Sequence, residues 1–497
     1  MVVVALMLAN WPLSPSPFTC QYLKCHTETM TRLKILMVVL LVASGCGGGS
    51  ETTTPATTAP PTTTEAAPAT TAAPATTAPP ATTAAPTTTA PPATTTLPPP
   101  NFELPGNFDA FNDQVQDAFK AIVDEEFTAM GAYKSGMAVA VVANGVLWTY
   151  ATGEASATAP MTTSTPTLIR STSKTFVAAL ILDLVEDGHF QLTDSLESVL
   201  SAHPDYSLLE PTMINGTATV HELLSMRSGI RNFAAGADEA NNLDLLWVVM
   251  KPSWKPVDTL GLIKDPWVEP GEYEYSDSNN YLLGMVAELH TGKDLPVLYR
   301  ERFLDPLGLA AVLIPDEPVP EGTARPFTDL DYWGGSGFGD MIELAAVQYG
   351  QTPDVWHEQD ARLSWATAGI VSTPANIARW AYELYSDNGS ALSDQSRSIL
   401  LNSINDETIS LAGQPQQYGY YVARRTFPLE DGTSLSVLGH PGGGAGYTSR
   451  VYYSPSLDMS ISILANSDLQ YARREAGCSE YGTADCISWG LFKAYAP

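Results

Sequence analysis

The chain has 497 residues, of which 54 are acidic and 25 are basic, so its formal net charge is −29. Binding the phosphates of DNA or RNA needs a basic surface that this composition does not supply, so a nucleic-acid partner is excluded. A hydrophobic content of 44% is sufficient for a sizeable core.

The amino terminus has the pattern of an export signal. Basic residues between Met30 and Lys34 precede an apolar run from Ile35 to Ala43, and Ser44-Gly45-Cys46 follows. This order is typical of a secretory signal. A cysteine directly after small residues resembles a bacterial lipobox, which would make Cys46 the lipidated first residue of the mature protein. An ordinary signal peptide or a single membrane anchor is the alternative.

From the order of basic, apolar and small residues we predict that residues 1–45 are a signal region whose true start is Met30. The catalytic domain is expected outside the cytoplasm, anchored to the membrane through lipid on Cys46.

Residues 46–106 are predicted to be a disordered stalk. Positions 51–100 contain 20 Thr, 14 Ala and 13 Pro and only one large apolar residue, Leu97. Such a segment has too little to bury to offset its ordering entropy. Its proline content favours extended polyproline II structure at about 3.1 Å per residue, so the segment is expected to hold a domain away from the membrane.

Cysteine usage agrees with export. Beyond Cys46, only Cys478 and Cys486 follow the signal region. In an oxidising compartment this pair is expected to form one disulfide near the carboxyl terminus, with two free thiols as the alternative.

Residues 107–497 are predicted to be one folded unit, because no second low-complexity break occurs. Its first expected element is an amphipathic helix, with apolar residues at helical spacing: Phe108, Phe111, Val115, Phe119, Ile122 and Phe127. A hairpin follows, because Asn144-Gly145 separates two β-rich runs at 137–143 and 146–151, and both turn residues tolerate positive φ.

The rest of the unit predicts an α+β fold. Residues 175–430 are expected to be mostly helix and loop, and 485–495 to be a helix. Antiparallel strands are expected at 434–438, 448–453 and 459–464. Strands at both ends around a helical middle indicate an antiparallel sheet built from both chain ends and flanked by helices, with a mostly helical subdomain beside it.

The first candidate catalytic pair is Ser171 and Lys174. Three residues apart on a helix, their side chains share one face. At the start of a buried apolar helix the lysine is expected to lose proton affinity and to activate the serine as a nucleophile. Backbone N–H groups at the helix start can stabilise an oxyanion. The alternative role for Ser171 is a helix N-cap.

Two further motifs follow in order. The segment Tyr275-Ser276-Asp277 resembles the YxN motif of penicillin-recognising serine hydrolases, and His440-Pro441-Gly442 resembles their HxG motif. With the Ser171 motif, the three stretches make the chain similar to the serine β-lactamase-related group, which includes class C β-lactamases, D-alanyl-D-alanine carboxypeptidases and related esterases. The resemblance covers nearly all of 130–470 and implies the β-lactamase/transpeptidase-like fold.

The resemblance also implies the roles of individual residues. Ser171 would be the nucleophile, Lys174 its activator and Tyr275 the proton shuttle to the leaving group. His440 and Gly442 would line the opposite wall on an edge strand, and the N–H groups of Ser171 and Gly443 would form the oxyanion hole. The reaction would be acyl transfer through an acyl-enzyme. No metal or organic cofactor is implied.

Asp277 departs from the pattern, because the YxN motif has asparagine there. Ionised aspartate accepts hydrogen bonds but cannot donate one to a substrate carbonyl, and it favours the ammonium form of Lys174. Either Tyr275 carries more of the base role, or substrates without that amide carbonyl, such as simple esters, are preferred.

Two classes of function remain. The first is an exported, lipid-anchored serine hydrolase acting on D-alanyl peptides of peptidoglycan, β-lactams or carboxylic esters. The second is a penicillin- or peptidoglycan-binding sensor module that keeps the pocket but turns over poorly. The sequence leaves the substrate and the oligomeric state open.

Overall fold

A computed structural model describes residues 100–106, 108–130, 135–156, 158–234, 248, 251, 253–326, 356–411, 414–429, 432–444, 446–467 and 482–496. Cys46, the predicted signal region and residues 46–99 of the predicted stalk lie outside these ranges. Within them, none of the helices is long and apolar enough to cross a bilayer.

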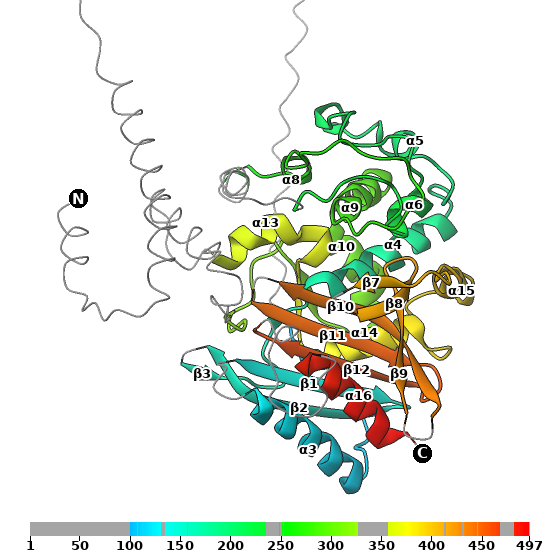
Figure 1. The fold of residues 1–497 in the computed structure, drawn as a ribbon. Helices are drawn as coiled ribbons and strands as arrows, with labels where there is room; N and C mark the ends of the chain where they lie inside the picture. Colours follow the sequence, from blue (N-terminus) through cyan, green and yellow to red (C-terminus); the bar gives the residue numbers. More distant parts are fainter. Residues whose placement is uncertain are drawn as a thin grey trace, which may run out of the picture. The chain divides into compact units, whose positions relative to one another are not determined.

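The central element is a nine-stranded antiparallel sheet with the order β3-β2-β1-β12-β11-β10-β9-β8-β7 (Figure 1). Its strands are β1 (Gly136–Ala143), β2 (Val146–Ser156), β3 (Ala159–Pro160), β7 (Ile409–Leu411), β8 (Gln414–Tyr418), β9 (Ala423–Pro428), β10 (Ser434–Gly444), β11 (Tyr447–Ser454) and β12 (Met459–Ala465). Strand β1 pairs with β12 in a register that sets Met137 opposite Ala465. The prediction of an α+β fold whose sheet joins both chain ends is therefore confirmed.

The predicted hairpin is also confirmed. Asn144 and Gly145 form the turn between β1 and β2 with φ of 45° and 78°, the left-handed backbone that such turns need.

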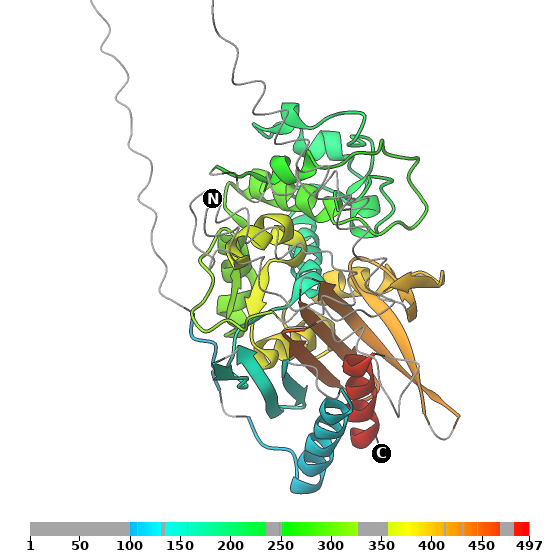
Figure 2. The same ribbon diagram turned by 60° about the vertical axis from the view of Figure 1, so that its left-hand side comes forward.

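Helices cover both faces of the sheet. On one face α3 (Asp113–Ala129) and α16 (Thr483–Tyr495), the first and last described helices, lie side by side (Figure 2). On the other face α14 (Pro374–Tyr385) packs against β1, β11 and β12. Because successive strand residues point to opposite faces, every residue of β1 is buried.

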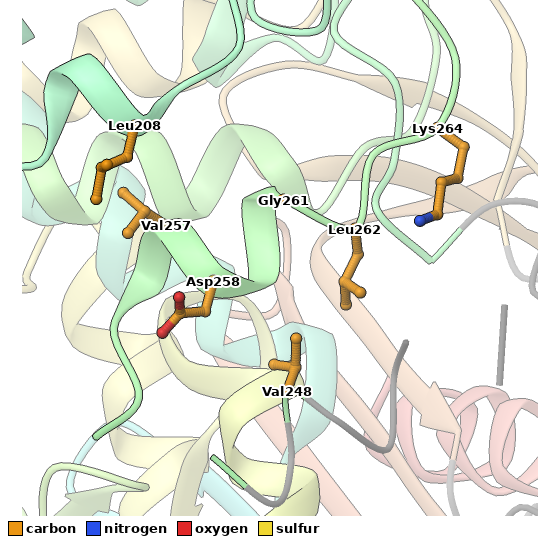
Figure 3. A pocket seen from close by; sticks show the side chains of 7 residues that line it. All are labelled: Leu208, Val248, Val257, Asp258, Gly261, Leu262 and Lys264. Atoms are coloured by element: carbon orange, nitrogen blue, oxygen red, sulfur yellow. The ribbon is translucent and has the colours of Figure 1, made fainter. Parts of the chain in front are cut away.

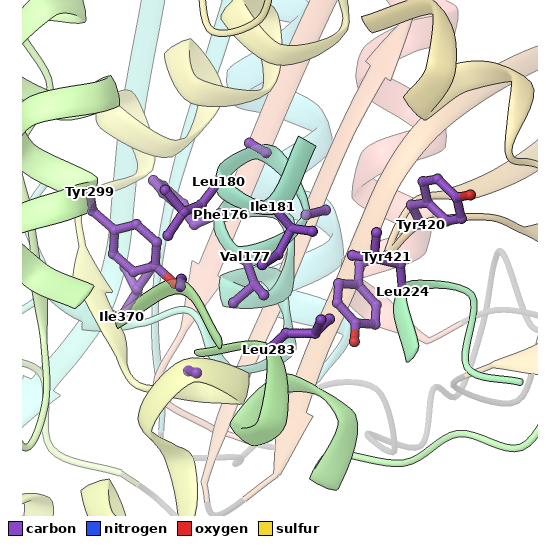
Figure 4. Packing of buried hydrophobic residues seen from close by; sticks show 14 of the residues in the cluster. Phe176, Val177, Leu180, Ile181, Leu224, Leu283, Tyr299, Ile370, Tyr420 and Tyr421 are labelled. Carbon is purple, nitrogen blue, oxygen red and sulfur yellow. The ribbon is translucent and has the colours of Figure 1, made fainter. Parts of the chain in front are cut away.

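The second part of the unit is a helical subdomain around α4 (Lys174–Glu186). Ten residues of α4 are buried, and Figure 4 shows Phe176, Val177, Leu180 and Ile181 packed among side chains from neighbouring elements. The other helices and turns are η1 (Arg170–Ser173), α5 (Leu196–Leu200), η2 (Tyr206–Leu208), α6 (Val220–Leu224), α8 (Pro256–Leu260), α9 (Ser278–Thr291), α10 (Leu295–Tyr299), η3 (Arg300–Leu304), α11 (Asp305–Leu307), α13 (Trp356–Ala368) and α15 (Asp394–Asn402). A small sheet of β4 (Thr167–Leu168), β6 (Ile370–Ser372) and β5 (Ala311–Leu313) joins the two parts.

The prediction that residues 175–430 are mostly helix and loop is incomplete. Strands β7, β8 and β9 lie in this stretch and extend the main sheet beyond β10. Strand β9 buries Arg425, which forms an ion pair of 2.6 Å with Asp485 of α16. A buried arginine in a short strand gives no apolar alternation, so the local pattern did not indicate a strand.

Candidate active site

Ser171 lies in the 3-10 turn η1, between strand β4 and helix α4. Arg170, the residue before it, has φ of 51°, a left-handed conformation that costs a non-glycine residue free energy and that often occurs at active sites. The N-cap of α4 is Ser173, so the alternative role of Ser171 as a helix N-cap is wrong. The hydroxyl of Ser171 is instead left for contacts across the site.

Lys174 and Tyr275 converge on the Ser171 hydroxyl. The Nζ of Lys174 and the hydroxyl of Tyr275 each donate to Ser171 Oγ at 3.0 Å. Lys174 is completely buried, whereas Ser171 and Tyr275 are half-buried and therefore within reach of a substrate. The Nζ of Lys174 also lies 5.0 Å from the centre of the Tyr275 ring.

The pKa shifts of the two neighbours distinguish their roles. Burial lowers the pKa of Lys174 below its ordinary 10.5, although the Asp277 carboxylate opposes this shift. Burial, with the charge of Asp277 adding to it, raises the pKa of Tyr275 well above 10. A lowered lysine pKa makes the neutral amine accessible, whereas the phenol keeps its proton. These pKa shifts, together with the hydrogen bonds to Ser171 Oγ, favour Lys174 as the proton acceptor and Tyr275 as a proton donor.

Asp277 forms an ion pair with Lys174. Its Oδ1 lies 2.7 Å from Lys174 Nζ and accepts a hydrogen bond of 2.6 Å from Thr367 Oγ1. Burial raises the pKa of Asp277, but the charge of Lys174, together with hydrogen bonds from Lys174, Thr367 and Asn232, outweighs this effect and lowers the pKa below 3.8. Asp277 is thus ionised, and the ammonium-stabilising effect expected from the sequence is present but smaller than the effect of burial on Lys174.

Thr367 is placed by an interruption of helix α13. Trp365 has φ of 24° and ψ of −124°, which breaks the helical path just before Thr367. The indole Nε1 of Trp365, at the interruption itself, donates to Asp316 Oδ2 at 2.7 Å. The backbone carbonyl of Thr367 then accepts a hydrogen bond of 3.1 Å from Lys174, so one residue holds both members of the ion pair.

The end of strand β10 closes the opposite side of the site. Its pairing with β9 ends at Gly439, whereas residues 438–444 pair with β11. The prediction that His440 and Gly442 lie on an edge strand is wrong, because β10 lies between β11 and β9 in the sheet. Residues 440–444 nevertheless lie beyond the last residue paired with β9, so this end of β10 is paired with β11 alone. A Cβ atom at Gly442 would collide with the carbonyl oxygen of Ile169 and the hydroxyl of Ser449. Glycine at 442 therefore allows the strand to lie directly against the turn that carries Ser171. Gly443 is next in the strand, opposite Thr448.

His440 is held by contacts of its own. Its Nδ1 lies 2.6 Å from the carbonyl oxygen of Pro441, and its Nε2 lies 2.8 Å from the hydroxyl of Tyr418. Burial, with the charge of Lys174 adding to it, lowers the pKa of His440 to about 3, so the imidazole is neutral. A neutral ring that donates from Nδ1 accepts at Nε2 from Tyr418. The ring lies 6.3 Å from that of Tyr275, so His440 forms a wall beside the proton donor.

The structure thus brings Ser171, Lys174, Tyr275 and Asp277 into direct contact, with Gly442, Gly443 and His440 on the adjoining strand. Sequence reasoning missed Thr367 and Tyr418. Thr367 lies within 130–470, the range that the family resemblance covers, and Tyr418 belongs to a cluster with Tyr420 and Tyr421. The oxyanion role of the Ser171 and Gly443 N–H groups stays a prediction.

The predicted disulfide lies partly outside the described residues. Cys486 on α16 is disulfide-bonded, but Cys478 is not among the described residues. The pairing of Cys478 with Cys486 stays a prediction.

Among the described residues, no three His, Cys, Asp or Glu side chains gather in a way that could hold a metal ion. A hollow of 360 Å³ lies beside α8 in the helical subdomain (Figure 3), with seven lining residues that do not include those around Ser171: Leu208, Val248, Val257, Asp258, Gly261, Leu262 and Lys264.

Comparison with known proteins identifies the family. A sequence model of the Beta-lactamase family matches residues 123–477, which is more than half of the chain. The chain belongs to the Beta-lactamase family. The resemblance predicted from the three motifs is therefore confirmed.

Individual members give more detail. The chain is 24% identical over 368 residues to a D-aminopeptidase of Cereibacter sphaeroides, covering 72% of this chain and 60% of that relative. Solved structures with the same fold include the D-amino acid amidase of Ochrobactrum anthropi SV3 in complex with D-phenylalanine, at 20% identity and a TM-score of 0.58 over 77% of this chain and 99% of that one. A D-stereospecific amidohydrolase of Streptomyces sp. matches with 19% identity and a TM-score of 0.54, over 77% of this chain and 98% of that one.

Proposed function

We propose that the protein is a serine hydrolase that cleaves the amide bond of D-amino-acid derivatives through an acyl-enzyme on Ser171. The observation that carries this proposal is the convergence of Lys174 Nζ and the Tyr275 hydroxyl on Ser171 Oγ, each at 3.0 Å. A nucleophile with a base and an acid in hydrogen-bond reach is the arrangement that acyl transfer needs.

The reaction follows from the contacts. Neutral Lys174 takes the proton of Ser171 as Oγ attacks the carbonyl carbon of the amide. Tyr275 gives its proton to the departing nitrogen as the carbon–nitrogen bond breaks, and Lys174 returns a proton to Tyr275. Water then attacks the ester, with Lys174 accepting its proton, and Ser171 is released with its proton restored. The products are a carboxylic acid and an amine.

The D-amino-acid substrate class is supported by the relatives. The curated relative is named a D-aminopeptidase, and two solved structures with this fold are named a D-amino acid amidase and a D-stereospecific amidohydrolase. The sequence predicted D-alanyl peptides of peptidoglycan, β-lactams or carboxylic esters as substrates. The names of the relatives favour amides of D-amino acids, a broader class than D-alanyl peptides, over β-lactams and esters.

Turnover of D-alanine amide and L-alanine amide by the purified protein tests this proposal. We expect ammonia release from the D-enantiomer to be at least ~10-fold faster in kcat/KM than release from the L-enantiomer, a difference that corresponds to ~1.4 kcal/mol of transition-state binding. Equal rates would contradict the stereochemical part of the proposal. Hydrolysis of a nitrophenyl ester without release of ammonia from either amide would indicate an esterase instead.

We also propose that the protein is exported and anchored by lipid on Cys46, with residues 51–100 as the stalk. The support is the order of basic, apolar and small residues before Cys46 and the Thr-, Ala- and Pro-rich composition after it. Mass spectrometry of the amino-terminal peptide from the membrane fraction is expected to show a diacylated cysteine at 46. A mature amino terminus ahead of Cys46 would contradict this proposal.

A further inference from the structure

The two oxygens of the Asp277 carboxylate have different surroundings. Oδ1 faces inward, where Lys174 and Thr367 contact it at 2.7 Å and 2.6 Å. Among the described residues, Oδ2 has one contact, a long one of 3.5 Å from Asn232 Nδ2. The side chain keeps 21% of its surface exposed, whereas that of Lys174 has none. With only this one long hydrogen bond, Oδ2 retains capacity to accept another, and the side chain that carries it is partly accessible.

The loop that carries Asn232 is fixed against the start of α9. Ser278 Oγ donates to the carbonyl oxygen of Arg231 at 2.8 Å and accepts from the N–H of Phe233 at 3.0 Å. The Oδ1 of Asn232 accepts from the N–H of Ala234, which orients the amide so that its Nδ2 points to Asp277. Asn232 and Asp277 are thus held next to each other by the fold. We call this pair of polar side chains near Ser171 the corner.

An ionised carboxylate selects the group that it contacts. It can only accept hydrogen bonds, so a substrate carbonyl directed at Oδ2 would place two acceptors against each other. A cationic donor would instead form a charge-assisted hydrogen bond, which is among the strongest available in proteins. The group best matched to Oδ2 is therefore an ammonium.

In an amino-acid amide, the α-ammonium group lies close to the bond that is cleaved. It is separated from the carbonyl carbon by the Cα atom alone. Ser171 Oγ and Asp277 are bridged by Lys174 Nζ, with contacts of 3.0 Å and 2.7 Å. Because both contacts are made by the same Lys174 nitrogen, the last of them to Asp277 Oδ1, the Asp277 carboxylate lies close to the nucleophile.

We propose that Asp277 Oδ2, in the corner that it forms with Asn232, binds the free α-ammonium of the residue whose carbonyl Ser171 attacks. This inference rests on the proposed function and narrows its substrate class. The enzyme acts on unblocked amino-terminal D-residues, and it discriminates against N-acylated substrates such as penicillins and internal residues of peptides.

A pair of chromogenic substrates tests the subsite: D-alanine p-nitroanilide and its N-acetyl derivative, with the full-length protein. Wild type is expected to prefer the free amine by at least ~10-fold in kcat/KM, and Asp277→Asn is expected to reduce this preference ~10- to 100-fold, as loss of a charged hydrogen bond requires. Thr367→Val is the matched control, because it removes the hydroxyl from the inward oxygen Oδ1. Its effect should fall on both substrates alike and leave their ratio within about threefold of wild type.

A second measurement needs only the wild-type protein. The KM for the free amine should rise as pH passes the pKa of the substrate ammonium, near ~8, whereas the KM for the N-acetyl substrate should not follow that titration. Equal preference for the two substrates in wild type would overturn the subsite while leaving the proposed function intact. A ratio unchanged by Asp277→Asn would do the same. Failure to hydrolyse either substrate would overturn the proposed function itself, and the subsite with it.

Discussion

Ser171→Ala is expected to lower kcat/KM for D-alanine p-nitroanilide by about 10⁴-fold or more, because the covalent route through the acyl-enzyme disappears. The fold should remain, since Ser171 is half-buried and is not the N-cap of α4. The variant is measured by steady-state kinetics, and intact mass after brief exposure to the substrate should show an acyl adduct in wild type only.

Ser173→Ala is the control for this variant. The hydroxyl of Ser173 accepts a buried hydrogen bond of 3.1 Å from the N–H of Ile370 and takes no part in the contacts around Ser171. Its loss is expected to cost about 1 kcal/mol of stability and to leave activity within about tenfold of wild type. Unchanged turnover in Ser171→Ala, or an acyl adduct in that variant, would show that Ser171 is not the nucleophile.

Local sequence patterns predicted the parts of the fold that depend on neighbouring residues. The β1–β2 hairpin follows from Asn144-Gly145, whose positive φ values the turn requires. The central strands were visible because their apolar runs match the period of a buried sheet. Strands β8 and β9 could not be predicted in this way, because neither has an apolar run: β8 is Gln-Pro-Gln-Gln-Tyr, and β9 contains two arginines. Their stability comes from partners far along the chain, such as Asp485 for Arg425.

In the candidate site, too, contacts between residues close in sequence could be predicted, whereas contacts that depend on distant parts of the chain could not. A spacing of three residues brings the Ser171 and Lys174 side chains together in any helical turn, so their contact could be predicted from the sequence although Ser171 lies in η1 and Lys174 begins α4. Tyr275 and Asp277 were found through the family resemblance. Thr367 reaches Asp277 from a part of α13 that is interrupted at Trp365, whose indole N–H donates to Asp316. Contacts made by such an irregular backbone have no periodic signal in the sequence.

Lys174→Met is expected to lower kcat/KM about 10³- to 10⁴-fold, since Ser171 loses its proton acceptor while Tyr275, with its raised pKa, remains protonated. The substitution also leaves the Asp277 carboxylate without its cation. Breaking a buried ion pair costs roughly 3 kcal/mol, so the free energy of unfolding should fall as well. Chemical denaturation and steady-state kinetics measure the two effects separately.

The double variant Lys174→Met with Asp277→Asn separates catalysis from folding. Removing both charges eliminates the uncompensated carboxylate, so stability is expected to return toward wild type while activity stays as low as in Lys174→Met. Recovery of activity together with stability would mean that Lys174 has a structural role only and that another group takes the proton of Ser171.

The single variant Asp277→Asn completes this set through its pH profile. The carboxylate raises the pKa of Lys174 against the effect of burial, so its removal should lower that pKa further. If neutral Lys174 is the base, the acid limb of kcat/KM must then move to lower pH. A nitrophenyl ester without an amino group is the substrate to use, because its binding does not involve an ammonium at Asp277. A shift to higher pH, or no shift, would be incompatible with Lys174 as the base, since Asp277 is the negative charge that holds the proton on that lysine.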